Sequence, residues 1–206
     1  MKIIDQSWCF EQKPQNVMET LERAARTCYK SEDKIADGSA EKLIAALIKN
    51  GHHSVLEHVN ISVRIITDRA VTHELVRHRL ASYSQESTRY VKYDDVEVIR
   101  PVWFDDLSEF DSSIDTWKSA MMVTENHYRY LIERGWRPEQ ARTVLPNSLK
   151  TEIFVTANVR EWRHIFKLRC SKKAHPQIRA LMLNMLKEFV REWPVLFNDI
   201  AEEYIY

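Results

Sequence analysis

The sequence predicts a single α/β domain in which helices outnumber strands. Two segments, 59–65 and 151–159, alternate apolar with polar side chains at the period of a half-buried strand. Around them lie longer segments whose apolar residues recur at helical spacing. A chain of 206 residues without an internal repeat or a linker-like stretch suits one domain, residues 1–206, with a substantial core.

The first half of the chain carries clear start and stop signals for helices. Ser39 suits the N-cap of a helix, and Gly51 suits the end of that helix. Asp68 follows the first alternating segment and can cap another helix. We therefore expect helices at 16–30, 39–49 and 70–79, a strand at 59–65, and a strand or extended segment at 96–102.

The second half is punctuated by Gly135, Pro138 and Pro194. Glycine is a common stop after a helix, and proline is well tolerated as the first residue of one. Pro194 separates two apolar-periodic segments near the end of the chain. We expect helices at 113–134, 138–144, 160–170, 175–193 and 195–204, and a strand at 151–159.

The composition argues against a polymeric partner and against a membrane. Lysine plus arginine number 30 and aspartate plus glutamate number 30, so the formal net charge is zero. No general electrostatic attraction to nucleic acid or to a lipid surface follows from that balance. No apolar run approaches the length of a membrane span, and residues 1–6 lack the apolar core of a signal peptide. We expect no nucleic-acid partner and no membrane contact.

Cysteine and glycine usage limits the kinds of structural and nucleotide-binding site that the chain can contain. Cys9, Cys28 and Cys170 are far apart and form no CxxC pair, which indicates neither a disulfide framework nor a structural zinc site. A reducing cytoplasm is the expected location. The chain has only three glycines, all well separated, so it contains neither a Rossmann fingerprint nor a P-loop. A nucleotide would have to be held by side chains.

The segment Arg77–Tyr90 supplies such side chains. It holds three arginines, three serines, a histidine and a glutamine, which suit the phosphates and the heterocycle of a nucleotide-like ligand. If the preceding helix continues through Arg77 and Arg79, these two residues point to nearly opposite sides and serve two ligands, or a ligand and a neighbouring subunit. From Ser82 onward we expect a loop that wraps a ligand. The alternative is a solvated helix end with ordinary surface arginines.

Two further clusters are candidate ligand contacts. In Gly51–His58, the side chains of His52, Ser54 and Glu57 suit polar contacts; three histidines and a glutamate also raise a metal site, but the spacing lacks HExxH. The alternative is a capped turn with solvated histidines. After the second strand come Asn158, Arg160, His164 and Arg169, at the kind of strand end where ligands often bind.

Two possible nucleophiles are less convincing. Ser87 would need an adjacent, oriented base that a sequence cannot show, so a role as a hydrogen-bond donor to ligand is preferred. Cys170 beside Arg169 can be an activated thiolate, but a buried, inert cysteine is more common.

These residues together resemble the signature of the flavin-dependent thymidylate synthases. The core of the match is Arg77-His78-Arg79, then seven residues, then Ser87, and the fuller match adds Ser82, Ser84, Gln85, Arg89 and Tyr90. Outside the signature the resemblance covers Gly51-His52, Ser54, Glu57-His58, Ala141-Arg142, Leu145-Pro146, Asn158, Arg160 and Leu168-Arg169, in an order and spacing that fit about residues 15–200.

The resemblance implies a fold, a reaction and an assembly. It implies an α+β domain with a central, mainly antiparallel sheet flanked by helices, assembled as a homotetramer whose active sites are shared between subunits. The family makes thymidylate (dTMP) from deoxyuridylate (dUMP): methylenetetrahydrofolate gives the carbon, and NADPH reduces a bound FAD that supplies the hydride. Catalysis without an enzymatic nucleophile is implied, and Ser87 is assigned to nucleotide binding. We expect no metal, since the histidine spacing lacks HExxH.

The resemblance also implies site residues. FAD is expected to contact Ser54, Arg77, His78, Arg79, Gln85, Asn158, Val159, Arg160 and His164. The dUMP molecule is expected to lie against Glu74, Leu75, Val76, Arg77, Gln85, Glu86, Ser87, Thr88 and Arg89 of one subunit, with Arg142 and Arg169 of another subunit closing over it. Arg169 is the expected catalytic residue, because its cation can stabilise negative charge on the uracil ring. His52 is expected near the flavin.

Three alternatives stay open. A relative that acts on the same nucleotide with another one-carbon outcome, such as hydroxymethylation, would carry the same motifs. A nucleic-acid-binding module that uses residues 77–92 would bind with steep salt dependence, and the zero net charge weighs against it. A homologue that binds the nucleotide without turnover is separated only by an assay.

Overall fold

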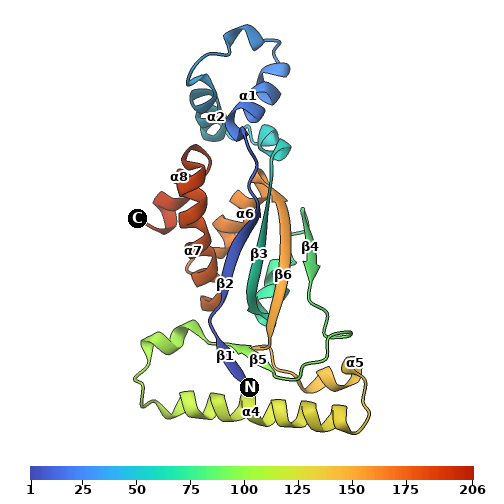
Figure 1. Ribbon diagram of the computed structural model, residues 1–206. Helices are drawn as coiled ribbons and strands as arrows, with labels where there is room; N and C mark the ends of the chain where they lie inside the picture. Colours follow the sequence, from blue (N-terminus) through green and yellow to red (C-terminus); the bar gives the residue numbers. More distant parts are fainter. The chain divides into compact units, whose positions relative to one another are not determined.

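The computed structural model describes residues 1–206 and has an α+β fold with eight α-helices and six strands. Its main sheet is antiparallel, four-stranded, and has the order β2-β3-β6-β4, so β3 and β6 are the central strands (Figure 1). A second, two-stranded sheet pairs β1 with β5 in parallel. The strands are β1 (Lys2–Ile4), β2 (Ser7–Gln12), β3 (Asn60–Asp68), β4 (Ala81–Gln85), β5 (Glu97–Ile99) and β6 (Lys150–Asn158).

The helices agree with the expected order along the chain. They are α1 (Val17–Thr27), α2 (Ser39–Lys49), α3 (Arg69–Leu75), α4 (Ser112–Glu133), α5 (Pro138–Ala141), α6 (Val159–Arg169), α7 (Pro176–Glu192) and α8 (Pro194–Tyr204). Short 3-10 helices lie at η1 (Glu32–Lys34), η2 (Ser54–His58), η3 (Val102–Asp106) and η4 (Arg142–Val144). None of the helices combines the length and the apolar character that crossing a bilayer requires.

The chain forms two compact units, and each strand of the main sheet contributes residues to both. Unit 1 comprises Met1–Trp8, Arg64–Arg77 and Tyr83–Phe154. Unit 2 comprises Cys9–Val63, His78–Ser82 and Val155–Tyr206. The boundary between the units therefore falls inside the Arg77-His78-Arg79 motif.

The core of unit 1 forms around Tyr128 of the long helix α4. Its ring is fully buried with Val96, Val98 and Leu149, and it meets the ring of Tyr93 edge to face at 6.0 Å between centroids. Burial of a whole aromatic side chain contributes roughly 1.5–3 kcal/mol, which makes this residue a principal anchor for the loop that contains Tyr93.

An aromatic cluster forms the core of unit 2. Trp162 and Phe166 of α6 pack against Phe189 of α7 at centroid distances of 5.3 and 5.0 Å, and Phe197 of α8 joins them. The indole Nε1 of Trp162 also donates to the carbonyl of Ile61 on β3 at 3.0 Å. Because this face of α6 is committed to the core, the residues on its other face are available for a site.

The junction between β6 and α6 is fixed by Asn158. Its side-chain Oδ1 accepts a hydrogen bond from the backbone N–H of Glu161 at 2.9 Å, as an N-cap does. The helix therefore begins at Val159, one residue before the expected start. Asp68 caps α3 in the same way, accepting from the N–H of Val71 at 2.7 Å, and this prediction is confirmed.

Three local predictions were wrong. The helix expected to reach Arg79 ends at Leu75, whose carbonyl accepts from the hydroxyl of Tyr83 at 2.9 Å. The loop expected from Ser82 begins instead as the edge strand β4, whose hydroxyl side chains Ser82 and Ser84 are exposed. An edge strand keeps polar residues because one face and one side remain in water.

The third wrong prediction concerns Ser39. Gly38 holds the cap position of α2 at φ 69°, where glycine carries no steric penalty, and Ser39 is the first helical residue. The hydroxyl of Ser39 donates to Glu22 on α1 at 2.7 Å instead.

Candidate functional site

Three of the predicted site residues lie at a cavity in unit 2. Its volume is about 600 Å³, within the range of small-molecule sites. Three expected flavin contacts line the cavity. Three lining residues have cationic side chains, namely Arg160, Arg163 and Lys167. The lining residues are His53, Glu57, Leu80, Asn158, Arg160, Glu161, Arg163, His164 and Lys167.

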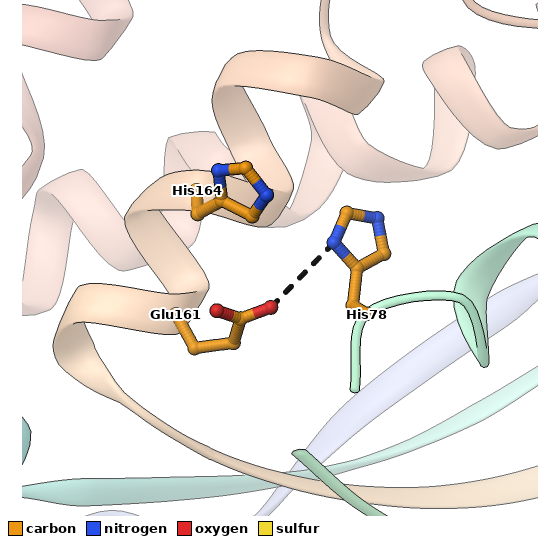
Figure 2. Close-up of side chains that lie close together, drawn as sticks. All are labelled: His78, Glu161 and His164. Carbon is orange, nitrogen blue, oxygen red and sulfur yellow. Dashed lines mark ion pairs between the residues drawn. The ribbon is translucent and has the colours of Figure 1, made fainter. Parts of the chain in front are cut away.

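Beside this cavity, His78, Glu161 and His164 form a cluster. Glu161 and His164 stand one turn apart on α6, and His78 reaches toward them from the turn after α3 (Figure 2). Nδ1 of His78 lies 3.6 Å from Oε1 of Glu161, and the rings of His78 and His164 meet edge to face at 5.6 Å between centroids. His78 and Glu161 are both buried, whereas His164 is exposed.

The environment keeps His78 uncharged. Burial lowers the pKa of His78 to about 4, and the neighbouring Arg169 and His164 act in the same direction. Burial also raises the pKa of Glu161, although His164 and Arg160 oppose that change. His78 is therefore a neutral imidazole at neutral pH, with one nitrogen that donates and one that accepts.

Arg169 uses the accepting nitrogen. Its Nε–H donates to Nε2 of His78 at 3.1 Å. Because Nε2 accepts, the single proton of the neutral ring belongs on Nδ1, the nitrogen that faces Glu161. The predicted catalytic residue is thus held by the central histidine of the signature motif.

The same three side chains have the chemistry of metal ligands. One ligand atom from each lies within 4.8 Å of the others. However, Arg169 already occupies Nε2 of His78, and the charge of Arg160 acts on Glu161, where it opposes the rise of the pKa that burial causes. Two fixed cations at this spot oppose a third, so the absence of a metal remains our prediction.

An ion pair between two lining residues lies at the cavity. Nη1 of Arg160 lies 2.6 Å from Oε1 of Glu57, and both side chains are about half exposed.

Other expected flavin residues do not line the cavity. Ser54 is exposed at the start of η2, Val159 is buried with its N–H bonded to the carbonyl of Val59, and Arg79 is exposed.

The expected nucleotide residues form a different group, in unit 1. The amide Nε2 of Gln85 donates to the hydroxyls of Thr72 and Thr151 at 2.9 and 3.1 Å. Ser87 accepts from the N–H of Arg89 through its hydroxyl and from Tyr90 and Val91 through its carbonyl, so residues 87–91 form a compact turn. Glu74 is half-buried, the side chain of Leu75 is fully buried, and Val76 and Arg77 are exposed.

Two residues that the sequence reasoning missed hold this turn. The hydroxyl of Tyr93 donates to Oε1 of Glu86 at 2.7 Å, and Nζ of Lys150 lies 3.1 Å from the other oxygen of Glu86. We call this group the Glu86 clasp. No motif marks Tyr93 or Lys150, because one lies in a loop and the other begins β6.

Arg142 belongs to the same group. Its Nη1 donates to the hydroxyl of Thr88, which is buried, at 3.0 Å. This contact lies within one chain, whereas the resemblance implies that Arg142 reaches the nucleotide from another subunit. The expectation of a shared site stays a prediction.

The expected flavin residues and the expected nucleotide residues lie mostly in different compact units. Apart from Arg77 and Gln85, which belong to both sets, every expected flavin residue lies in unit 2. Apart from Arg169, every expected nucleotide residue lies in unit 1. Within unit 2, Asn158, Arg160, His164, His78 and Arg169 form one connected group around the cavity and the cluster.

Cys170 is an inert thiol. It is fully buried, and burial raises its pKa to about 12, with Arg179 opposing the change. A thiol of that kind is not a nucleophile at neutral pH. The prediction that this cysteine is buried is confirmed.

Comparisons with known proteins show the family of this chain. The family model described as thymidylate synthase complementing protein matches residues 11–195. The flavin-dependent thymidylate synthase of Geobacter sulfurreducens is 38% identical over 85% of this chain and 78% of its own length. That of Pyrococcus furiosus is 36% identical over 84% and 75%, and that of Mycolicibacterium gilvum 37% over 87% and 78%.

A solved structure supports the fold. The crystal structure of PolB, a UMP/dUMP methylase from Streptomyces cacaoi bound with 5-Br dUMP, superposes with a TM-score of 0.85. The superposition covers 99% of this chain and 98% of the PolB chain, and the two sequences are 22% identical. This likeness shows that the two proteins share a fold.

Proposed function

The chain belongs to the family of flavin-dependent thymidylate synthases, and we propose that it converts dUMP to dTMP with a bound FAD. One observation carries the proposal at the level of the site. Asn158, Arg160 and His164, three expected flavin contacts, line one cavity, and His78 beside it binds the expected catalytic Arg169. Methylenetetrahydrofolate is the proposed carbon donor and NADPH the proposed reductant.

The cavity fits the charged part of a flavin dinucleotide. Its lining includes Arg160, Lys167 and His164, and such groups suit a pyrophosphate. Leu80 and the apolar stems of the long side chains suit a ring. We propose that Asn158, Arg160 and His164 hold FAD here, with Ser54, Arg77, His78, Arg79, Gln85 and the backbone of Val159 as further contacts. When reduced, FAD supplies the hydride.

The proposed nucleotide site uses a preformed turn. Residues 87–91 form a compact turn, and we propose that the Glu86 clasp together with the Arg142–Thr88 bond fixes this turn before any ligand binds. Such preorganisation reduces the entropy lost on binding. Arg89 and Arg142 supply charge for the phosphate of dUMP, and Glu74–Arg77 and Gln85 complete the proposed contacts.

Arg169 is the proposed catalytic residue. A guanidinium is permanently charged and planar, so it can lie beside the uracil ring and stabilise the negative charge that develops there. The bond from its Nε to His78 restrains the orientation of that plane. Ser87 orients the nucleotide in this scheme, and the buried Cys170 takes no part.

The assembly and the location are also proposals. We propose that the whole chain, residues 1–206, works as one thymidylate synthase domain, since the family model spans segments of both units. The family resemblance supports a homotetramer with shared active sites. The three cysteines are free thiols, which suits a reducing cytoplasm. Small molecules, and neither nucleic acid nor membrane, are the proposed partners.

Anaerobic incubation with FAD, NADPH, dUMP and methylenetetrahydrofolate tests the reaction. The product nucleotide is identified by mass. We expect a yellow protein that loses its colour with NADPH and yields dTMP. Hydroxymethylated dUMP would show the alternative one-carbon outcome, and a folded protein that takes up no FAD would contradict the proposal.

Mixing inactive variants tests the shared site. Arg89→Ala and Arg169→Ala are each expected to be inactive alone. If the two side chains serve one site from different subunits, unfolding and refolding the two variants together regenerates a fraction of wild-type sites. Light scattering reports the number of subunits. A monomer, or no recovery from mixed tetramers, would contradict the shared assembly.

A further inference from the structure

Glu161 is a buried carboxylate beside a cavity that suits an anion. It is only 6% exposed and lines the cavity with Arg160 and Lys167. A negative charge here repels the phosphates that the other residues attract, and burial of a carboxylate costs free energy unless a partner compensates it. No proposed ligand contact uses this side chain, so its presence needs another explanation.

Two of the neighbouring cations form ion pairs with other carboxylates. Arg160 pairs with Glu57 at 2.6 Å. Arg163 pairs with Asp199 at 2.6 Å and also donates to the carbonyl of Leu196. The group that Glu161 faces is instead His78, through Nδ1 at 3.6 Å (Figure 2).

The Glu161–His78 contact lies opposite the His78–Arg169 bond. Nδ1 of the imidazole faces Glu161, and Nε2 accepts from Nε of Arg169 at 3.1 Å. A neutral imidazole carries its proton on one nitrogen only, and the carboxylate favours the form with the proton on Nδ1. With the proton on Nε2, that nitrogen would point an N–H at the N–H of Arg169, and the bond would be lost.

We propose that Glu161 is a positioning residue of the reaction, which holds His78 as the Nδ1–H tautomer so that Nε2 fixes the guanidinium of Arg169. The inference rests on the proposed catalytic role of Arg169. The three residues act in line: carboxylate, imidazole, guanidinium. Carboxylate–histidine pairs fix tautomers in this way at other kinds of site, where loss of the carboxylate costs about 10- to 100-fold in activity or affinity.

Labelling with ¹⁵N-histidine measures the tautomer directly. The holoenzyme has eight histidines, and His78→Gln identifies the signal of His78 by its loss. We expect the nitrogen shifts of His78 to report the Nδ1–H form in the wild-type protein. In Glu161→Leu, which is close to glutamate in volume but has no acceptor, we expect a mixture or the Nε2–H form.

Steady-state kinetics then connects the tautomer with turnover. In Glu161→Leu we expect kcat to fall about 10- to 100-fold while the KM for dUMP changes less than about threefold. Glu161→Gln keeps the shape and one oxygen that can accept from Nδ1, so we expect a smaller loss of kcat. Glu192→Gln is the matched control, because it removes a carboxylate from an ion pair with Lys13 elsewhere in unit 2.

The outcomes separate cleanly. A tautomer change together with a fall in kcat supports the inference. An unchanged tautomer in Glu161→Leu, or a changed tautomer with full activity, overturns it. If Glu161→Leu does not fold, Glu161→Gln decides: behaviour identical to Glu192→Gln in both measurements overturns the inference. A wild-type protein with the Nδ1–H tautomer but without dTMP production would overturn the proposed function instead.

Discussion

Nε of Arg169 donates to Nε2 of His78 at 3.1 Å, and the two residues lie 91 positions apart in the chain. One ends α6 and the other follows α3, so the bond ties the last turn of a helix to the signature motif. Since His78 is neutral, it can accept from a cation without repelling it. The side chain proposed to act on the nucleotide is therefore oriented by the motif that first identified the family.

The first prediction concerns Arg169→Lys. Lysine keeps the charge but loses the planar guanidinium and the Nε–H that His78 accepts. We expect kcat to fall by about 100-fold or more, the range seen when one preorganised donor is removed from a reacting centre. Flavin content should stay at the wild-type level. Turnover and the flavin absorbance of the purified variant are the measurements, and a variant with kcat within a few-fold of wild type would contradict the catalytic role.

The second prediction is a pH dependence of stability. Burial lowers the pKa of His78 from the usual 6.5 of histidine to about 4, with Arg169 and His164 contributing. Between these two pH values the unfolded chain binds a proton that the folded protein does not, so stability decreases as the pH falls from about 6.5 to about 4. Above 6.5 both states are neutral and the effect disappears. The decrease from this one group is at most about 3 kcal/mol.

Chemical denaturation at several pH values checks the second prediction. In His78→Gln the titrating group is absent, so we expect a shallower loss of the free energy of unfolding across this window. The difference between the two proteins isolates His78 from the carboxyl groups that also titrate in acid. Parallel curves for wild type and variant would argue against a neutral His78.

The third prediction tests the Glu86 clasp. Tyr93→Phe removes the hydroxyl that donates to Glu86 at 2.7 Å and leaves the ring packed against Tyr128. Loss of one hydrogen bond to a charged group costs about 1.5 kcal/mol. We expect the turn of residues 87–91 to be less rigid as a result. We expect the KM for dUMP to rise severalfold with little change in kcat. Steady-state kinetics measures both, and Tyr130→Phe, on an exposed ring of α4, is the control.

Local signals in the sequence predicted most of the elements. The alternation at 59–65, the cap at Asp68, and the punctuation by Gly135 and Pro138 each report an interaction within a few residues, and each appears in the structure. The helix end after Leu75 was missed because it depends on Tyr83, whose hydroxyl reaches back from an edge strand. β1 was missed because it is three residues long and is stabilised by pairing with β5, far along the chain.

The site residues also divide into those that the sequence pattern predicted and those that depend on contacts between distant parts of the chain. The resemblance carried the nucleotide and flavin residues by their order and spacing, and three of them line one cavity. Glu161, Tyr93 and Lys150 were missed because each acts on another residue of the site, and nothing local marks such a role. The contact of Glu161 with His78 exists only where α6 meets the turn after α3.

The last prediction concerns Glu57, which we expect to compete with an anionic cofactor for Arg160. The pair is short at 2.6 Å, but both side chains are about half exposed, so the pair itself adds little stability. In Glu57→Gln the repulsion of a phosphate is removed and Arg160 remains, so we expect FAD to bind severalfold more tightly. Arg160→Gln should weaken FAD binding about tenfold or more, since a charged hydrogen bond contributes about 1.5–3 kcal/mol. Quenching of flavin fluorescence gives both dissociation constants, with Glu192→Gln as the control. Weaker binding in Glu57→Gln would contradict this prediction. It would mean that the Glu57 carboxylate contacts the cofactor directly, for example at a ribose hydroxyl, and that the ion pair positions Arg160 for binding instead of competing with the phosphate.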